Sequence, residues 1–213
     1  MKVTHWPLHG LRVRTPRLEL RLPTPDELDE LAELSAQGIH QPGTMPFAVP
    51  WTDQPPAGRA RSVMQFHWRT LGEWTPQDWT LPLVILLDGT VVGSQSLTGR
   101  AFPIMREVET GSWLGLRHQG QGIGTEMRAA AVHLAFAGLN AESAVTAAMT
   151  DNPASITVSN KIGYRRNGLV RTVVGGTLRY KQHFALDRDA WEAHRTVPVE
   201  IDGLEPCLPQ FGL

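Results

Sequence analysis

The chain has 213 residues, of which 41% are hydrophobic and 19% charged, which suits one globular domain with a sizeable core. Its 20 Lys and Arg residues balance 21 Asp and Glu residues, so the sequence does not suggest a nucleic-acid-binding protein. A single cysteine excludes an intramolecular disulfide and a thiolate metal cluster. The N-terminus lacks an apolar signal core and no run approaches the roughly 20 apolar residues that span a bilayer, so we expect a cytoplasmic protein with no membrane partner.

The N-terminal third of the chain predicts a strand followed by two helices. Residues 11–23 alternate leucine with charged residues, which is typical of one half-buried strand. The segment TPD at 24–26 is a typical helix start, and an apolar stripe continues this helix to Gly38. A second helix is expected at 57–74. The segment at 40–53 is irregular and rich in Pro, Trp and Phe, so it is either a stiff connector or a wall that faces a substrate.

The rest of the chain predicts alternating strands and helices. Two apolar runs around an Asp88-Gly89 turn indicate a β-hairpin at 81–97. The elements expected after it are a strand at 106–116, an alanine-rich helix at 122–139, a strand at 143–149, a capped helix at 151–163 and a final strand at 178–186. The tail that follows contains apolar residues and prolines, and we expect it to pack on this body. The order of the elements predicts an α+β fold with a local parallel crossover.

The stretch RHQGQGIGTE at 117–126 places three glycines directly before the alanine-rich helix. At such a strand-to-helix junction, the free N–H groups and the positive end of the helix dipole favour a phosphate or pyrophosphate. A P-loop would need a Lys after the last glycine, and a dinucleotide fingerprint would need GxGxxG and an acidic residue about 20 residues further on. The sequence fits both poorly. An ordinary glycine turn is the remaining alternative.

Four segments together resemble the GNAT superfamily of N-acyltransferases. Gln119-x-x-Gly122-x-Gly124 is similar to the Q/R-x-x-G-x-G/A signature, which binds the pyrophosphate of acyl-coenzyme A in that family. The segment NPASITVSNKIGY at 152–164 and the strand VETGSWLG at 108–115 resemble two further family segments. The segment TPRLELRL at 15–22 is similar to the opening of the branch that contains ribosomal-protein N-terminal acetyltransferases.

The resemblance implies a single GNAT acyltransferase domain over residues 1–213. Its core spans 11–187, with an insert at 40–80 and a C-terminal extension at 188–213. The implied fold is a mixed, mostly antiparallel sheet with a local parallel βαβ crossover, splayed at the acyl-CoA site and flanked by helices. The insert and the extension go beyond the generic family, and both resemble a mycobacterial GNAT protein described as a succinyl-CoA-dependent succinyltransferase. They are also candidate surfaces for a homo-oligomer.

The implied activity is transfer of an acetyl or succinyl group from coenzyme A to a primary amine, by direct attack in a ternary complex. The sequence does not distinguish a protein N-terminus, a lysine side chain and a small amine as the acceptor, because all three present the same nucleophile. A non-catalytic acyl-CoA-binding sensor on the same fold is the alternative.

The resemblance also assigns residues to the coenzyme. Coenzyme binding is implied for Trp113, Leu114, Leu116, Gln119, Gly120, Gln121, Gly122, Ile123, Gly124, Thr125, Asn152 and Lys161. Trp113 is alternatively plain core, Asn152 a helix cap and Lys161 a solvated helix residue. No metal is expected, because the HxxxH spacing of His5 and His9 lies in a segment with no helical pattern.

Two catalytic roles follow from the same resemblance. Glu109 stands where many relatives carry the carboxylate that takes a proton from the attacking ammonium, and Glu107 on the same strand face is the alternative base. The glycine at position 111 is expected to permit a bulge that re-aims this strand. Relatives usually carry a Tyr that protonates the departing thiolate; here Ser159 takes its place, and Ser155 matches the serine suggested for that role in the ribosomal-protein branch.

A succinyl group would bring a carboxylate that needs a partner near the splayed strands. The candidates for this partner are Arg12, Arg14, Arg17 and His67. The sequence does not rank them.

Overall fold

The computed structural model describes residues 4–213. Its strands are β1 (Arg12–Arg14), β2 (Leu18–Arg21), β3 (Trp79–Leu87), β4 (Thr90–Gly99), β5 (Glu107–Leu114), β6 (Ser143–Met149), β7 (Arg165–Val174), β8 (Thr177–Asp187) and β9 (Glu200–Asp202). Its helices are α1 (Pro25–Gln37), α2 (Pro56–Gly72), α3 (Phe102–Met105), α4 (Ile123–His133), α5 (Pro153–Ile162) and α6 (Arg188–His194). None of the helices within these residues is long and apolar enough to cross a lipid bilayer.

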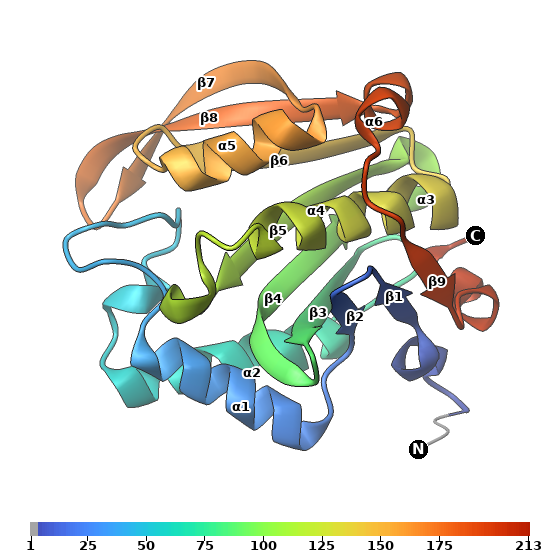
Figure 1. Ribbon diagram of the computed structural model, residues 1–213, viewed down its shortest axis with the longest axis horizontal. Coiled ribbons are helices and arrows are strands. Elements are labelled where there is room, and N and C mark those ends of the chain that lie inside the picture. Colours follow the sequence, from blue (N-terminus) through green and yellow to red (C-terminus); the bar gives the residue numbers. More distant parts are fainter. Residues whose placement is uncertain (1–3) are drawn as a thin grey trace.

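The described strands form one mixed sheet in the order β7-β8-β6-β5-β4-β3-β2-β1-β9. Among these strands, β5 and β6 are the parallel pair, and the other neighbours are antiparallel. Helix α4 connects the two parallel strands and lies in front of the sheet in Figure 1. The predicted α+β fold with a mixed sheet and a local parallel crossover is confirmed.

Apolar side chains cover both faces of the sheet. Alternate residues of β3 point to opposite faces, so Leu83 and Ile85 join the larger core with α4, while Val84 and Leu86 join a smaller core with α1 and α2. Burial on both faces explains why β3 is a continuous apolar run instead of an alternating one. The sheet is therefore held between helices on its two faces.

Two local predictions are confirmed at the start of this architecture. Asp88 and Gly89 form the turn between β3 and β4, with φ angles of +50° and +79°. Helix α1 begins with a capping box, in which Thr24 Oγ1 accepts the N–H of Glu27 and the Glu27 carboxylate accepts the N–H of Thr24. Pro25 occupies the first helical position, where its missing N–H costs nothing.

Residues 11–23 form two short antiparallel strands, not the single strand predicted from the leucine alternation. The chain reverses between β1 and β2, where Thr15 Oγ1 accepts the N–H of Leu18 at 2.9 Å. Pro16 lies in this reversal and has no N–H to give to a ladder. The leucine pattern is right for β2, but proline ends the ladder before it.

The prediction that 178–186 is the final strand is also wrong, because the tail forms β9 and pairs with β1. Strand β7 was not predicted. Nearly all of its residues are exposed, so its sequence RRNGLVRTVV shows no alternation of apolar and polar side chains. It is held by pairing with β8 alone, at the edge of the sheet.

The C-terminal tail packs on the body, as predicted. Phe211 is fully buried, with its ring centroid 4.8 Å from that of Trp79 and 5.4 Å from that of Trp74. Trp74 Nε1 donates a hydrogen bond to the carbonyl of Gln210 at 2.7 Å. Cys207 is fully buried in the same segment, and its Sγ lies 3.1 Å from the carbonyl oxygen of Gly203.

The buried thiol gives a direct test of this docking. Burial raises the pKa of Cys207 to about 11, so the thiol stays neutral in the folded protein. We expect a thiol reagent at pH 8 to modify the folded protein slowly and the denatured protein rapidly, as measured by absorbance. Because the pKa of Cys207 is higher in the folded protein than the value of about 8.5 in the unfolded chain, the neutral thiol stabilises the folded state fully below that pH. This contribution to the free energy of unfolding is lost as the pH rises toward 11. Rapid modification without denaturant would contradict the packing of the tail.

Candidate functional site

The site begins where the two parallel strands part. Strands β5 and β6 pair only from Glu107 opposite Ser143 to Glu109 opposite Val145. Beyond this point β5 remains paired with β4, and β6 with β8. In the described part of the chain, the β6-side edge of β5 therefore has no strand partner from Thr110 onward. This gap is the splay that the fold prediction required.

A glycine-rich loop joins the open end of β5 to α4. Gly120 and Gly122 adopt φ angles of +75° and +80°, a left-handed conformation that other residues rarely take. Among the described residues, no acceptor is found for the five consecutive N–H groups from Gly120 to Gly124. Free N–H groups at the positive end of a helix are a binding site for a phosphate. The loop therefore has the chemistry of an anion cradle.

The two glutamines of the loop use their side chains to hold it in place. Gln119 Nε2 donates to the carbonyls of Ile39 at 2.7 Å and Leu114 at 3.0 Å, so it ties the loop to the end of β5. Gln121 Nε2 donates to the carbonyl of Arg117 at 2.9 Å. These side-chain amides fix the loop conformation, which leaves the backbone of the loop to meet a ligand.

An ion pair supports the cradle from the β1–β2 turn. Arg17 Nε donates to Glu126 Oε2 at 2.7 Å, and Thr15 Oγ1 donates to Glu126 Oε1 at 2.6 Å. Arg17 also donates to the carbonyl of Gln121 at 3.3 Å, and one of its terminal nitrogens lies 3.5 Å from where a side chain on Gly122 would begin. Arg17 thus adds positive charge beside the cradle. This role of Arg17 was not predicted from the sequence.

The residues expected to bind a succinyl carboxylate do not lie at the gap. Arg12 and Arg14 are on β1, which β2, β3 and β4 separate from β5. Both arginines form ion pairs with Glu19. His67 is buried in α2, and burial lowers its pKa. Arg17 lies at the phosphate cradle. This expectation is therefore wrong for Arg12, Arg14 and His67, because sequence position did not reveal which strands would be neighbours.

The side chains of β5 divide between the two faces of the sheet. Trp113 packs on the smaller core, and its ring centroid lies 6.0 Å from that of Trp51. Leu114 is buried in the larger core, and Leu116 is 38% exposed just beyond the strand. The side chain of Trp113 is therefore a packing residue, whereas the open backbone edge of β5 faces the gap.

The two candidate bases have different surroundings. Glu107 accepts a hydrogen bond from Ser143 Oγ at 2.6 Å, across the parallel pair. Glu109 is exposed at the last paired position, where the gap begins. The bulge expected at Gly111 is absent, because β4 and β5 keep one register throughout; instead Gln95 Nε2 donates to the carbonyl of Gly111 at 2.8 Å.

Helix α5 forms the other side of the gap. Asn152 Oδ1 accepts the N–H of Ser155 at 3.1 Å, so Asn152 is the helix cap and its amide nitrogen faces no acceptor among the described residues. Ser155 Oγ likewise has no partner there, whereas Ser159 is fully buried and its Oγ donates to the carbonyl of Ser155. Lys161 lies further along α5 and is exposed; with Thr125 it lines a small groove that includes Arg195.

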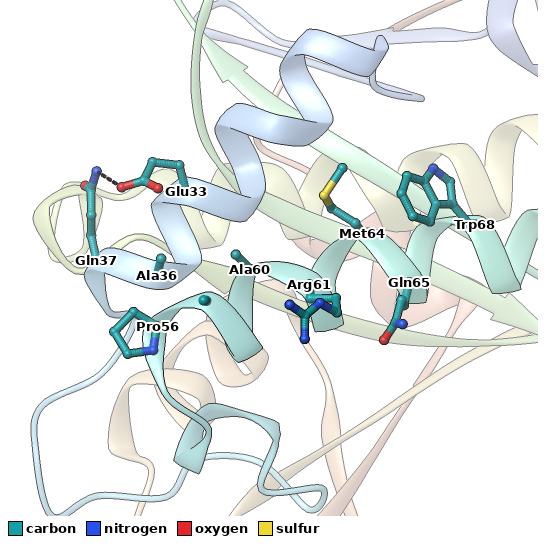
Figure 2. Close-up of a pocket in the computed structure, with 10 residues that line it drawn as sticks. Glu33, Ala36, Gln37, Pro56, Ala60, Arg61, Met64, Gln65 and Trp68 are labelled. Atoms are coloured by element: carbon teal, nitrogen blue, oxygen red, sulfur yellow. Dashed lines mark hydrogen bonds between the residues drawn. The ribbon is translucent and has the colours of Figure 1, made fainter.

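A larger hollow lies elsewhere, between α1 and α2. It encloses about 780 Å³ and is lined by residues that include Ala60, Met64 and Trp68, whose side chains come from α2 (Figure 2). Gln37 donates to Glu33 at its rim. It contains none of the loop residues or free N–H groups, so size alone does not identify the anion site. Within residues 4–213, no group of three metal-ligating side chains is found.

A sheet that parts beside the glycine-rich start of a helix can hold a ligand that carries both phosphate and amide groups. A family model described as an acetyltransferase (GNAT) domain matches residues 17–165. The chain therefore belongs to the GNAT acetyltransferase family, whose enzymes transfer an acyl group from acyl-coenzyme A.

Solved structures share this fold. Mycobacterium smegmatis RimJ, in complex with CoA-disulfide, has a TM-score of 0.66 at 16% identity and covers 95% of each chain. RimL, a ribosomal L7/L12 alpha-N-protein acetyltransferase in complex with coenzyme A, has a TM-score of 0.62 at 20% identity, covering 83% of this chain and 97% of its own. A spermidine N-acetyltransferase chimera from Vibrio cholerae and hSSAT has a TM-score of 0.65 at 14% identity, covering 83% and 98%.

A single substitution tests the cradle. A side chain at Gly124 would begin 3.6 Å from Val158 Cγ2 and 3.8 Å from Leu114 Cδ1, so Gly124→Val narrows the space where α4, α5 and β5 meet without straining a left-handed backbone. We expect the Kd for coenzyme A to rise at least tenfold, about 1.4 kcal/mol, in isothermal titration calorimetry.

Gly72→Val is the matched control, because Gly72 ends α2 with open space around it. It should bind coenzyme A like the unmodified protein. Unchanged affinity in a folded Gly124→Val variant would contradict the assignment of the cradle.

Proposed function

We propose that this protein moves an acetyl or succinyl group from acyl-coenzyme A to a primary amine, by direct attack in a ternary complex. The observation that carries the proposal is the run of free N–H groups from Gly120 to Gly124, beside the gap between β5 and β6. These groups suit a pyrophosphate. The open edge of β5 suits an amide-containing pantetheine arm, which would hydrogen-bond like an added strand.

The amine is proposed to approach from the face of β5 that carries Glu109. Gly111 and Trp113 share this face, because side chains alternate along a strand. The insert adds aromatic rings to it: the centroid of Trp51 lies 6.0 Å from that of Trp113 and 5.4 Å from that of Phe47. Aromatic faces and a carboxylate both attract an ammonium group. Of the two interpretations of segment 40–53, this arrangement favours the wall that faces a substrate.

The insert is also fixed to the far side of the gap. Arg179 on β8 donates to Asp151 at 2.6 Å and to the carbonyl of Met45 at 3.5 Å. Asp151 directly precedes Asn152, the cap of α5. The aromatic wall is thus connected to β5 through Trp113 and to β8 through Arg179, and it would close the acceptor side around the amine.

Proton transfer is assigned to two side chains. Glu109 would accept the proton of the ammonium, directly or through water, because it is exposed at the point where the gap opens. Ser155 would donate a hydrogen bond to the thiolate as it leaves, since its hydroxyl has no partner among the described residues. Ser159 is excluded from that role by its burial and its bond to Ser155.

Replacing the proposed base separates these roles. Glu109→Gln keeps the shape of the side chain but cannot accept a proton, so we expect kcat to fall by roughly 10²-fold. Coenzyme affinity should barely change, and activity should partly recover at high pH, where the amine deprotonates by itself. Steady-state release of free thiol with a panel of amines measures kcat and its pH dependence, and calorimetry measures the affinity for the coenzyme.

Glu107→Gln is the control on the same strand face. Because Ser143 already holds the Glu107 carboxylate, we expect this variant to keep most of its activity. The reverse pattern would move the base to Glu107. A protein that binds coenzyme A tightly and releases no thiol with any amine would instead be an acyl-CoA sensor, and the proposal would fail.

A further inference from the structure

One arginine is buried beneath the gap. Arg128 lies on the sheet-facing side of α4 and is 4% exposed. Its Nη1 donates to Thr146 Oγ1 on β6 at 3.1 Å, and its Nη2 donates to Ser112 Oγ on β5 at 2.9 Å. Its Nε lies 3.4 Å from Gln95 Oε1 on β4. The guanidinium therefore spans the floor between the two strands that part, and all three of these partners are neutral.

The part of the chain that the structure describes supplies no counter-ion for this cation. In residues 4–213, no carboxylate oxygen lies within 4.0 Å of an Arg128 nitrogen. Glu126, on the same helix, is held by Arg17 and Thr15. Glu107 and Glu109 have the opposite strand parity to Ser112, so they lie on the other face of β5.

The nearby phenol does not supply the missing charge either. Burial raises the pKa of Tyr164, against the opposing effect of Arg128 and Thr110, so its hydroxyl stays neutral. Burial also lowers the pKa of Arg128, with Tyr164 opposing, although an arginine remains charged in proteins. A buried, unpaired cation is unfavourable in the free protein, and an anion that reaches it is strongly favoured.

The position of Arg128 matches the acyl end of the co-substrate. An arm that starts at the cradle and follows β5 from Leu114 toward Glu109 passes Ser112, the residue that Arg128 bonds. The acceptor amine is proposed to approach from the Glu109 face, so a substituent of the acyl group that points away from the amine points toward Arg128.

From this placement, and resting on the proposed function, we infer that Arg128 binds a terminal carboxylate of the acyl group. The co-substrate is then a dicarboxylic acyl-coenzyme A, of which succinyl-CoA is the probe. A guanidinium binds a carboxylate through two parallel N–H bonds. In the free protein, Nη1 and Nη2 donate to hydroxyl groups on opposite sides of the gap. The two oxygens of a carboxylate can take the place of these hydroxyl acceptors. An acetyl group offers no such partner.

The test compares the binding of coenzyme A, acetyl-CoA and succinyl-CoA by calorimetry, which needs no turnover. We expect the unmodified protein to bind succinyl-CoA at least tenfold more tightly than acetyl-CoA. Arg128→Met should abolish this preference and leave the Kd for coenzyme A and acetyl-CoA within about twofold. Arg128→Lys keeps the charge but loses the fork, so it should retain only part of the preference.

Arg188→Met is the control for losing an arginine that packs at the other end of α4, where Arg188 bonds the carbonyls of Phe136 and Ala141. It should keep the succinyl-CoA preference. Equal affinity of the unmodified protein for acetyl-CoA and succinyl-CoA would overturn the inference while leaving the proposed function intact. So would an equal loss for all three ligands in both Arg128 variants, which would make Arg128 purely structural. Failure of coenzyme A itself to bind would overturn both.

Discussion

The parting of β5 and β6 after Glu109 is the constraint on which the rest of the site depends. Unpaired backbone groups along a strand edge are costly when they are buried without a partner. Here β4 and β8 hold the outer edges of the two strands, so the sheet continues on both sides of the opening. Thr146 and Gln119 side chains bond the carbonyls of Thr110 and Leu114 at the two ends of the open stretch, and between them the edge of β5 has no strand partner in the described chain and can pair with a ligand.

Helix α4 connects this opening to the anion cradle. Its N-terminus lies at the open end of β5, and its buried face crosses the floor of the gap. The carboxylate of Glu126 in its first turn is mostly buried and is paired with Arg17 and Thr15. Hydrogen bonds to a charged group of this kind contribute about 1.5–3 kcal/mol each, so the β1–β2 turn holds the start of α4 firmly. The helix start that would meet the phosphates is therefore held in place by residues of the protein itself.

Polar side chains gather where the core meets the gap. Gln95, Thr110 and Thr146 are buried around Arg128, whereas the other buried residues of α4, apart from Glu126, are apolar. Local rules are usually broken in this way at functional sites, because a purely structural core gains nothing from buried polar groups. The conflict between burial and charge at Arg128 is the sharpest case in this chain.

The elements with a local signal could be predicted from the sequence. The hairpin turn at Asp88-Gly89, the cap at Thr24 and the glycine loop each follow from the conformations that short segments allow. The two-strand split at Pro16 was missed because the alternation of apolar and charged residues was read across the proline, and the exposed strand β7 was missed because it has no hydrophobic period. Arg12 and Arg14 were wrongly expected to bind the carboxylate of a succinyl group for a different reason: which strands become neighbours is a property of the whole sheet.

Arg128 was within reach of sequence reasoning. It directly follows Met127 on α4 and lies three residues before Ala131, so it falls inside the apolar stripe that predicted the helix. A charged residue inside such a stripe is a signal for a buried functional group. Its partners on β5 and β6 could not be predicted, because they depend on where the two strands part.

Amide hydrogen exchange with and without coenzyme A measures the central claim most directly. We predict slowed exchange at Gly120 to Gly124 and at those β5 amides between Thr110 and Leu114 that point away from β4, because a bound coenzyme would pair N–H groups that have no strand partner there. Amide exchange in the residues that line the hollow between α1 and α2 should be unaffected. Tight binding of coenzyme A that protects that hollow and leaves the loop and β5 unprotected would contradict the account.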